Sequence, residues 1–166
     1  MKTLFLLRHA KTAPATAGAL DFDRILTPQG ETDSRLVGEY IERKQLKIDQ
    51  VVSSPANRAR GTTALVLEAA WLVVEVQYDR RMYEADPQLM LDIVSESASS
   101  HDSILLVGHN PAMEDFLRGL TGRVESLSAG GIAQIESEVT SWTELGPGKC
   151  ELKLLLSPGD LGLAAS

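Results

Sequence analysis

The sequence predicts an α/β fold, namely a three-layer α/β/α sandwich around a mostly parallel sheet with one antiparallel element. Three observations support this class. Short apolar runs alternate with helical patterns over most of the chain. The last two apolar runs follow each other with no helix between them, so the antiparallel element is expected there. The chain has 166 residues, enough for one sizeable core but not for two, which predicts a single domain over residues 1–166.

The expected strands are short and apolar. The first one, at residues 4–7, is too short to cross a membrane, and its bulky residues suit a strand that is buried on both faces. It stops at an arginine and a histidine. The other strands are expected at residues 51–54, 73–76, 103–107, 132–139 and 151–156.

The expected helices share a start signal, in which a polar N-cap residue is followed by proline. Proline has no amide proton to lose at the first helical position. The first two helices are expected to end near Arg43 and Ala70, and the tail from Ser157, rich in Gly, Ala and Ser, is expected to fray. The four start signals are Thr27-Pro28, Ser54-Pro55, Asp86-Pro87 and Asn110-Pro111.

The charge of the chain argues against nucleic acid or an anionic membrane as its partner, because the net charge is −7 and the pI is about 5.0. An anionic ligand must therefore be bound by a local cluster of arginines. Cys150 is the one cysteine, which excludes an intrachain disulfide and favours a reducing compartment. Arg8, His9 and Lys11 interrupt the N-terminal apolar run, so we expect no export signal and a cytoplasmic protein.

Charged and ionisable residues follow the predicted strands at the points where the strands end. Arg8 and His9 end the first strand, and His109 follows the fourth. Because the carboxyl ends of parallel strands open into the ligand crevice of an α/β sheet, we expect these residues at one edge, near helix N-termini. Arginines and histidines at such an edge predict a site for a phosphoryl group. Further expected members are Arg58 and Arg60 after the second strand, and Arg80, Arg81 and Glu84 after the third.

Each of these residues also has an ordinary structural role open to it. A single histidine at a strand end is most often hydrogen-bonded, and an arginine on a helix is most often solvated. Their ordered combination favours function, since joint matches to several motifs are rarely spurious. Zinc would need three or four ligands and would be repelled by the arginines, so no metal is expected. No glycine pattern of a serine hydrolase or of a nucleotide cofactor site is found.

Three motifs together resemble those of the histidine phosphatase superfamily, which has the phosphoglycerate mutase fold. They are Arg8-His9, Ser53-Ser54-Pro55-Ala56-Asn57-Arg58-Ala59 and Gly108-His109-Asn110-Pro111. Within the superfamily the chain is similar to the small phosphohistidine phosphatase branch. Two further segments point to that branch, namely Thr27-Pro28-Gln29-Gly30 and Leu155-Leu156-Ser157-Pro158. Ala10 departs from the superfamily pattern, which has glycine after the histidine, and we interpret it as a mark of the small branch.

The resemblance implies a phosphatase that uses no metal or organic cofactor. In such an enzyme His9 would attack phosphorus and become phosphohistidine, while Arg8, Arg58 and His109 would form the phosphate pocket. Neutral imidazole is a good nucleophile, and fixed positive charge stabilises the transferring phosphoryl group. The positive neighbours are also expected to lower the pKa of His9.

The general acid and the substrate have alternatives at this level. Glu84 lies where larger members of the superfamily carry the acid, and Asp21, in the loop after His9, is the alternative. The connecting loops contain no insertion that could fold as a lid, which suits a phosphorylated side chain on another protein and argues against a mutase. We therefore expect a protein phosphohistidine phosphatase. The alternatives are a phosphomonoesterase for small metabolites with the same site, and a phosphate-binding module without turnover.

Overall fold

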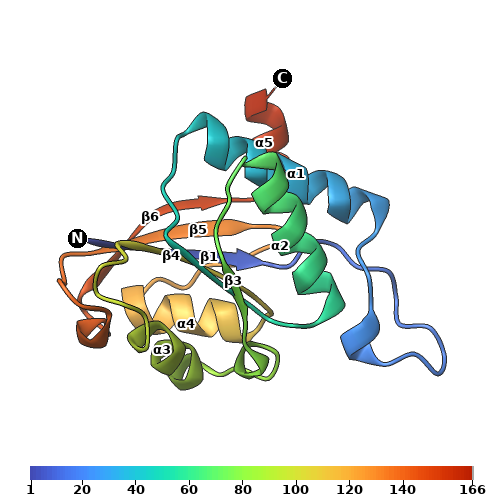
Figure 1. The fold of residues 1–166 in the computed structure, drawn as a ribbon. Helices are drawn as coiled ribbons and strands as arrows, with labels where there is room; N and C mark the ends of the chain where they lie inside the picture. The colour runs from blue at the N-terminus through green and yellow to red at the C-terminus, as the bar shows by residue number, and fades with distance from the viewer. Residues whose placement is uncertain (166) are drawn as a thin grey trace.

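The computed structural model describes residues 1–165, in which six strands form one mixed sheet with helices on both of its faces (Figure 1). The order across the sheet is β3-β2-β4-β1-β5-β6. The strands are β1 (Lys2–Arg8), β2 (Gln50–Ser53), β3 (Val76–Tyr78), β4 (Ser103–Gly108), β5 (Ile132–Ser137) and β6 (Cys150–Leu156). The α-helices are α1 (Pro28–Arg43), α2 (Asn57–Ala69), α3 (Pro87–Ser95), α4 (Ala112–Thr121) and α5 (Pro158–Ala165). The short 3-10 helices are η1 (Asp21–Asp23), η2 (Arg80–Met82) and η3 (Trp142–Glu144).

The strand directions confirm a mostly parallel sheet with one antiparallel element. β1 pairs in parallel with β4, and β2 pairs in parallel with both β4 and β3. β5 is antiparallel to β1 and to β6, so it is the one reversed strand in the described part of the chain. The connection from β5 to β6 contains only η3, as the two consecutive apolar runs predicted.

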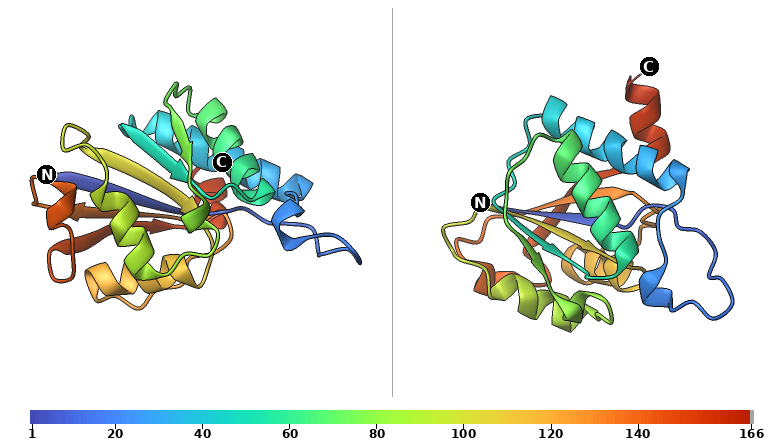
Figure 2. Two further views of the ribbon diagram at one scale, coloured as in Figure 1. Left: turned by 60° about the horizontal axis from the view of Figure 1, so that its bottom comes forward. Right: turned by 45° about the vertical axis from the view of Figure 1, so that its right-hand side comes forward.

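The helices cover both faces of the sheet and confirm the three-layer sandwich. α1, α2 and α5 lie on one face, and α3 and α4 lie on the other (Figures 1 and 2). Side chains of β1 alternate between the two buried layers: Leu4 and Leu6 pack toward α3 and α4, whereas Phe5 and Leu7 pack toward α1 and α2. The N-terminal apolar run is therefore the centre of the core. None of the helices in residues 1–165 has both the length and the apolar composition that a bilayer span requires.

Two of the four predicted helix starts are N-caps of the expected kind. The hydroxyl of Thr27 accepts a hydrogen bond from the N–H of Gly30 at 3.0 Å, and Pro28 is the first residue of α1. The carboxylate of Asp86 accepts one from the N–H of Leu89 at 2.8 Å at the start of α3. Each such cap stabilises its helix by about 1 kcal/mol.

The start predicted at Ser54-Pro55 is wrong. α2 begins at Asn57, and its N-cap position is Ala56, whose backbone is still extended. The hydroxyl of Ser54 accepts a hydrogen bond from the N–H of Ala56 and lies 2.7 Å from Nε2 of His109. Ser54 therefore connects the ends of β2 and β4 and leaves the helix uncapped.

The start predicted at Asn110-Pro111 is also wrong. α4 begins at Ala112, and no side chain caps it. Nδ2 of Asn110 donates instead to the carboxylate of Glu114 at 2.7 Å and to the carbonyl of Leu127 at 2.9 Å. The side chain of Asn110 thus joins α4 to the loop before β5, and it is not available as a cap.

The third strand lies later than predicted. Residues 73–76 have a β-branched composition, but pairing with β2 begins only at Val76, opposite Val51. Val73 is fully exposed, and Trp71 has a positive φ of 56° in the turn that ends α2. The turn at residues 70–71 is followed by an irregular segment, which takes up residues 73–75 of the predicted strand. β5 also ends earlier than predicted, at Ser137.

The tail after β6 forms a helix over residues 158–165, so the prediction that it frays is wrong for this part, and residue 166 lies outside the described residues. Ser157 and Asp160 form a capping box: the hydroxyl of Ser157 accepts from the N–H of Asp160 at 3.1 Å, and the carboxylate of Asp160 accepts from the N–H of Ser157 at 2.9 Å. Leu161 is buried against the layer that contains α1. The prediction rested on the Gly- and Ala-rich composition of the tail, which gives no indication of this reciprocal cap.

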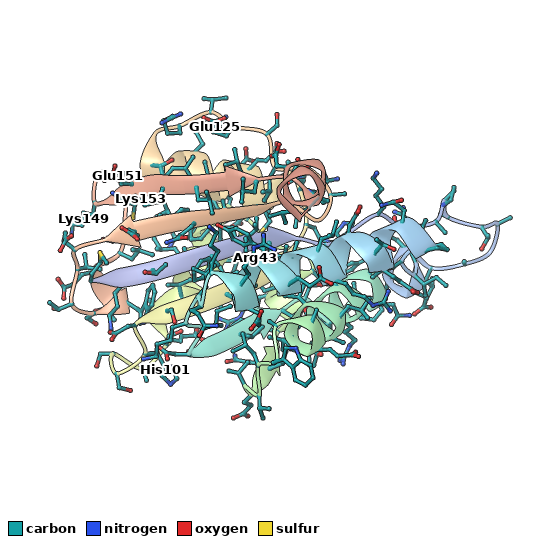
Figure 3. The ribbon with its side chains drawn as sticks, turned by 90° about the horizontal axis from the view of Figure 1, so that it is seen from above. Arg43, His101, Glu125, Lys149, Glu151 and Lys153 are labelled. Atoms are coloured by element: carbon teal, nitrogen blue, oxygen red, sulfur yellow. The ribbon has the colours of Figure 1, made fainter. Side chains whose placement is uncertain are left out.

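β6 forms one edge of the sheet and carries charged side chains (Figure 3). Lys153 forms an ion pair with Glu151 at 2.9 Å, and Lys149 lies just before the strand. Charged side chains on an edge strand oppose pairing with the edge of another sheet. The free side of β6 is therefore protected against edge-to-edge association.

The contact between α1 and α2 depends on Gly38. A Cβ added at this residue would lie 2.6 Å from the Cβ of Ala69 and against the carbonyl oxygen of Val66. We expect Gly38→Ala to lower the free energy of unfolding by about 2 kcal/mol, because one of the two helices must move. Gly119→Ala in α4 is the control, since no atom lies within 4 Å of its added Cβ. Urea unfolding that gives equal midpoints for the two variants would contradict this account.

Candidate active site

The structure brings His9 and His109 together at the carboxyl edge of the sheet. Arg8 and Gly108 are opposite each other at the ends of β1 and β4, and the two histidines follow them. The N–H of His9 donates to the carbonyl of Gly108 at 3.0 Å. As a result, the centroids of the two imidazole rings lie 5.1 Å apart although the residues are distant in the sequence.

His9 uses only Nδ1 for hydrogen bonding within residues 1–165, which leaves Nε2 without a partner there. Nδ1 of His9 lies 2.8 Å from the carbonyl oxygen of Ala10. A carbonyl oxygen can only accept, so in the neutral ring Nδ1 carries the proton and Nε2 keeps its lone pair. This is the tautomer that a nucleophilic imidazole needs.

Two arginines flank the histidine pair and keep donor atoms free. Arg8 donates through Nη1 to the carbonyl of Leu127 at 3.1 Å. Arg58, in the first turn of α2, is 7% exposed and donates through Nη1 and Nη2 to Asp21. Nε of Arg8, Nε of Arg58 and Nδ1 of His109 are buried and have no hydrogen-bond partner within residues 1–165. Because buried polar atoms normally have partners, these three nitrogens indicate a site for an anion. They belong to two arginines whose charges act on His9 and to the histidine ring next to it.

Burial and positive charge lower the pKa of both histidines. The pKa of His9 is lowered to about 4, first by burial and then by the charges of Arg58 and Arg8, which together outweigh its hydrogen bond to Ala10. The pKa of His109 is lowered to about 3, first by burial and then by His9 and Arg58. The sequence predicted a lowered pKa for His9 from its positive neighbours, but burial is the larger cause. Both rings are therefore neutral at pH 7.

We predict that acid pH destabilises the fold through these histidines. Unfolded histidine binds a proton at a pKa of about 6.5, whereas the folded chain does so at about 4 for His9 and about 3 for His109. The unfolded chain holds more protons between these values, so the free energy of unfolding falls as the pH drops from about 7 to about 4. Urea unfolding at pH 7 and pH 5 measures the fall, and His9→Asn is expected to reduce it. An undiminished fall in this variant would contradict the lowered pKa.

Asp21 and Tyr83 border the site on one side. Oδ2 of Asp21 accepts hydrogen bonds from Nη2 of Arg58 at 3.0 Å and from the hydroxyl of Tyr83 at 2.7 Å. The ring of Tyr83 stands edge-on to His109, with centroids 5.6 Å apart, and to Phe22, with centroids 5.1 Å apart. No sequence pattern predicts a role for Tyr83, because this residue lies in no motif and reaches the site only through the η2 turn.

Other residues predicted at this edge lie outside the cluster. Glu84 is exposed, and its side chain has no hydrogen bond or ion pair within the described residues. Arg81 is directed to Asp79 and Glu96, with which it forms ion pairs of 2.7 Å each. Residues 1–165 also contain no group of three or more His, Cys, Asp or Glu side chains that could hold a metal ion. Arg60 and Arg80 lie over the aromatic rings of Tyr78 and Phe22.

Comparisons with known proteins agree with this geometry. The family model of the histidine phosphatase superfamily (branch 1) matches residues 4–93, which is more than half of the chain. The chain belongs to this superfamily. Among histidine phosphatases of known structure, it is similar to the putative phosphohistidine phosphatase SixA from Agrobacterium tumefaciens, with 27% identity and a TM-score of 0.82 over 95% of this chain and 98% of that one. The family and the fold predicted from the motifs are thus confirmed.

Two related sequences are less completely matched. An uncharacterized protein of Mycobacterium tuberculosis is 31% identical over 105 residues, so the chain spans 63% of that relative, and the match covers 63% of this chain. A broad-specificity phosphatase of Saccharomyces cerevisiae is 37% identical over 67 residues, which are 39% of this chain and 29% of that protein. Together with the family match and the SixA structure, the similarity to the yeast protein supports a phosphatase.

Proposed function

We propose that this histidine phosphatase hydrolyses phosphohistidine on another protein, through a phosphohistidine intermediate on His9. One observation carries the proposal: three residues next to His9 have buried nitrogen atoms that lack partners in residues 1–165, and Nε2 of His9 forms no hydrogen bond there. The buried nitrogen atoms are Nε of Arg8, Nε of Arg58 and Nδ1 of His109. A tetrahedral oxyanion beside His9 would provide acceptors for all three.

The proposed reaction has two displacement steps. In the first, the lone pair on Nε2 of His9 forms a bond to phosphorus while the bond from phosphorus to the leaving imidazole nitrogen breaks, and that nitrogen takes up a proton. In the second, water forms a bond to phosphorus and gives up a proton, and the bond to His9 breaks. The products are inorganic phosphate and free His9. The scheme requires no metal or organic cofactor.

The positive groups stabilise the charge of the transferring phosphoryl group. A guanidinium is a permanent positive charge, and the buried Nε–H groups of Arg8 and Arg58 act in surroundings from which water is largely excluded. The hydroxyl of Ser54, 2.7 Å from Nε2 of His109, is able to donate to that atom. His109 would then carry its proton on Nδ1 and donate it to a phosphoryl oxygen. These three residues form the proposed phosphate pocket.

Glu84 is the proposed general acid for poor leaving groups. It directly follows Tyr83, which borders the site, and its side chain is exposed, although it makes no contact with the cluster in the described residues. A leaving imidazole nitrogen needs less proton donation than a leaving alkoxide. We therefore expect Glu84→Gln to slow hydrolysis of an alkyl phosphate by about 10²-fold and that of phosphohistidine by less than about tenfold. Steady-state rates on both substrates check this, and equal losses would exclude Glu84 from the role.

Three features support a phosphorylated ring on a protein as the substrate. The similar structure from Agrobacterium tumefaciens is described as a putative phosphohistidine phosphatase. The strand-to-helix connections within residues 1–165 contain no inserted domain, so a side chain on a large partner can approach. The ring of Tyr83 lies beside His109 and is itself packed against Phe22, so a flat leaving group can pack against this aromatic pair.

A phosphomonoesterase for small metabolites is the second candidate, because the same residues would catalyse that reaction. The partial similarity to a yeast broad-specificity phosphatase favours it. The substrates of such a phosphomonoesterase would differ from phosphohistidine only in the leaving group. A phosphate-binding module without turnover would have no use for a nucleophile at His9, which makes that alternative the weakest.

Turnover of 4-nitrophenyl phosphate tests the proposal. A catalyst is expected to release a burst of nitrophenol and to carry a phosphoryl label that is labile in acid and stable in base, as a phosphoramidate is. A binding module would give neither. Rates on a phosphohistidine peptide and on a panel of sugar phosphates then separate the two enzymes. A preference for sugar phosphates would contradict the protein substrate.

A further inference from the structure

The loop that follows His9 returns to the site and engages Arg58. Nη1 of Arg58 donates to the backbone carbonyl of Asp21 at 2.8 Å, and Nη2 donates to Oδ2 of the same residue at 3.0 Å. These two contacts occupy the outer edge of the planar guanidinium. Since a guanidinium held at two atoms cannot rotate, the direction of its Nε–H bond is fixed as well.

The carboxylate of Asp21 is itself held by two other side chains. The hydroxyl of Tyr83 donates to Oδ2 at 2.7 Å, and Nη1 of Arg24 donates to Oδ1 at 3.2 Å. Tyr83 also stands edge-on to His109. A continuous set of contacts therefore runs from His109 through Tyr83 and Asp21 to Arg58, along one side of the proposed phosphate pocket.

Asp21 is poorly suited to the role of proton donor. Its pKa is lowered to about 2, chiefly by the hydrogen bond from Tyr83 and further by those from Arg24 and Arg58, against a smaller effect of burial. The same hydrogen bond raises the pKa of Tyr83, so the tyrosine stays a donor. At neutral pH Asp21 carries no proton to give, which weighs against the general acid that the sequence offered as its alternative.

We propose that Asp21 and Tyr83 are positioning residues: Asp21 holds the Nη edge of Arg58, and Tyr83 holds Asp21, so that Nε–H of Arg58 faces the phosphoryl group before it binds. The inference rests on the proposed function, because it concerns the phosphate pocket of that reaction. Donors fixed in advance stabilise a transition state without the cost of reorganisation. If Asp21 did not position Arg58, its carboxylate would only repel the phosphoryl group. Removal of Asp21 would then strengthen phosphate binding, whereas loss of positioning would weaken it.

The test compares Asp21→Ala with Asp21→Asn. For Asp21→Ala we expect kcat/KM to fall by about 10- to 100-fold and the affinity for inorganic phosphate, measured by calorimetry, to weaken as well. Asp21→Asn is expected to show a smaller fall in kcat/KM and in phosphate affinity, because its amide oxygen still accepts a hydrogen bond from Arg58. The loss is expected to be the same for 4-nitrophenyl phosphate and for phenyl phosphate, whose leaving groups differ in basicity.

A double-mutant cycle tests the role of Tyr83. Tyr83→Phe keeps the ring against His109 and removes only the donor to Asp21, so a loss of about three- to tenfold is expected. In the Asp21→Ala background the same change is expected to cost nothing further, since the residues act in series. Asp23→Asn is the matched control, because Asp23 is an exposed carboxylate on the same 3-10 helix.

Three results would overturn the inference. A loss that grows with the basicity of the leaving phenol, and that is equal in Asp21→Ala and Asp21→Asn, would make Asp21 the general acid. Tighter phosphate binding in Asp21→Ala would mean that the carboxylate of Asp21 only repels phosphate and does not position Arg58. Additive losses of kcat/KM in the double-mutant cycle would mean that Tyr83 acts independently of Asp21. If the native protein formed no phosphohistidine, the proposed function would fail instead, while the phosphate affinities would still report on the positioning of Arg58.

Discussion

Replacement of His9 by asparagine is expected to lower turnover of an aryl phosphate by at least about 10⁴-fold, because it removes the atom that forms the covalent intermediate. The amide of asparagine still donates or accepts hydrogen bonds, so the polar surroundings of the site change little. Inorganic phosphate is expected to bind nearly as well as before, since the atoms proposed to hold it belong to Arg8, Arg58 and His109. Stopped-flow release of nitrophenol and calorimetric titration of phosphate measure the two effects.

The matched control for this experiment is His101→Asn. Nδ1 of His101 is 3.0 Å from Oε1 of Gln50, and this pair lies at the opposite end of β2 from the site. Full activity is expected in this variant, with circular dichroism used to verify the fold of both. Residual turnover above about one per cent of normal in His9→Asn would disprove nucleophilic attack by His9.

Replacement of Arg58 by alanine has the second largest expected effect. It removes a buried positive charge whose Nε has no partner in residues 1–165, and it also leaves the carboxylate of Asp21 with Arg24 as its remaining ion-pair partner. Both changes act in the same direction, so we expect kcat/KM to fall by about 10³-fold. Arg58→Lys is expected to recover only part of this, since an ammonium group cannot bind Asp21 and the phosphoryl group with fixed geometry.

Arg60→Ala is the control for Arg58→Ala, because Arg60 lies two positions further along α2. Arg60 is exposed, donates to the carbonyl of Pro55 at 2.9 Å and lies over the ring of Tyr78. Its removal is expected to leave kcat/KM within about threefold of normal, as is usual for an exposed arginine outside a site. Similar losses in the two variants would indicate a general electrostatic effect of α2 instead of a specific contact of Arg58.

The sequence predicted those parts of the fold that depend on local patterns. Apolar runs and N-cap signals of the kind found at Thr27 and Asp86 depend on neighbouring residues only, and they identified α1 and α3 correctly. The predictions failed where a residue has a distant partner. Ser54 resembles an N-cap, yet its hydroxyl contacts His109, a residue that no local pattern brings near it.

The candidate site shows the same limit. His9 and His109 were predicted at one edge because each follows a parallel strand, and the topology of the sheet requires their ends to meet. The side chains of Asp21 and Tyr83 depend on the path of two irregular connections, for which composition gives no geometry. Their mutual contact at 2.7 Å, and through it the orientation of Arg58, could be found only in three dimensions.

The central position of β1 has a consequence for biosynthesis. The ribosome makes this strand before all others, yet its neighbours in the sheet are β4 and β5: Thr3 pairs with Ser103, and Leu4 pairs with Ile135. Contacts of such long sequence separation form late and slow the search for the native state. In a nascent chain from which β5 has not yet emerged, the edge of β1 that pairs with β5 has no partner. This exposed apolar strand would bind chaperones or aggregate.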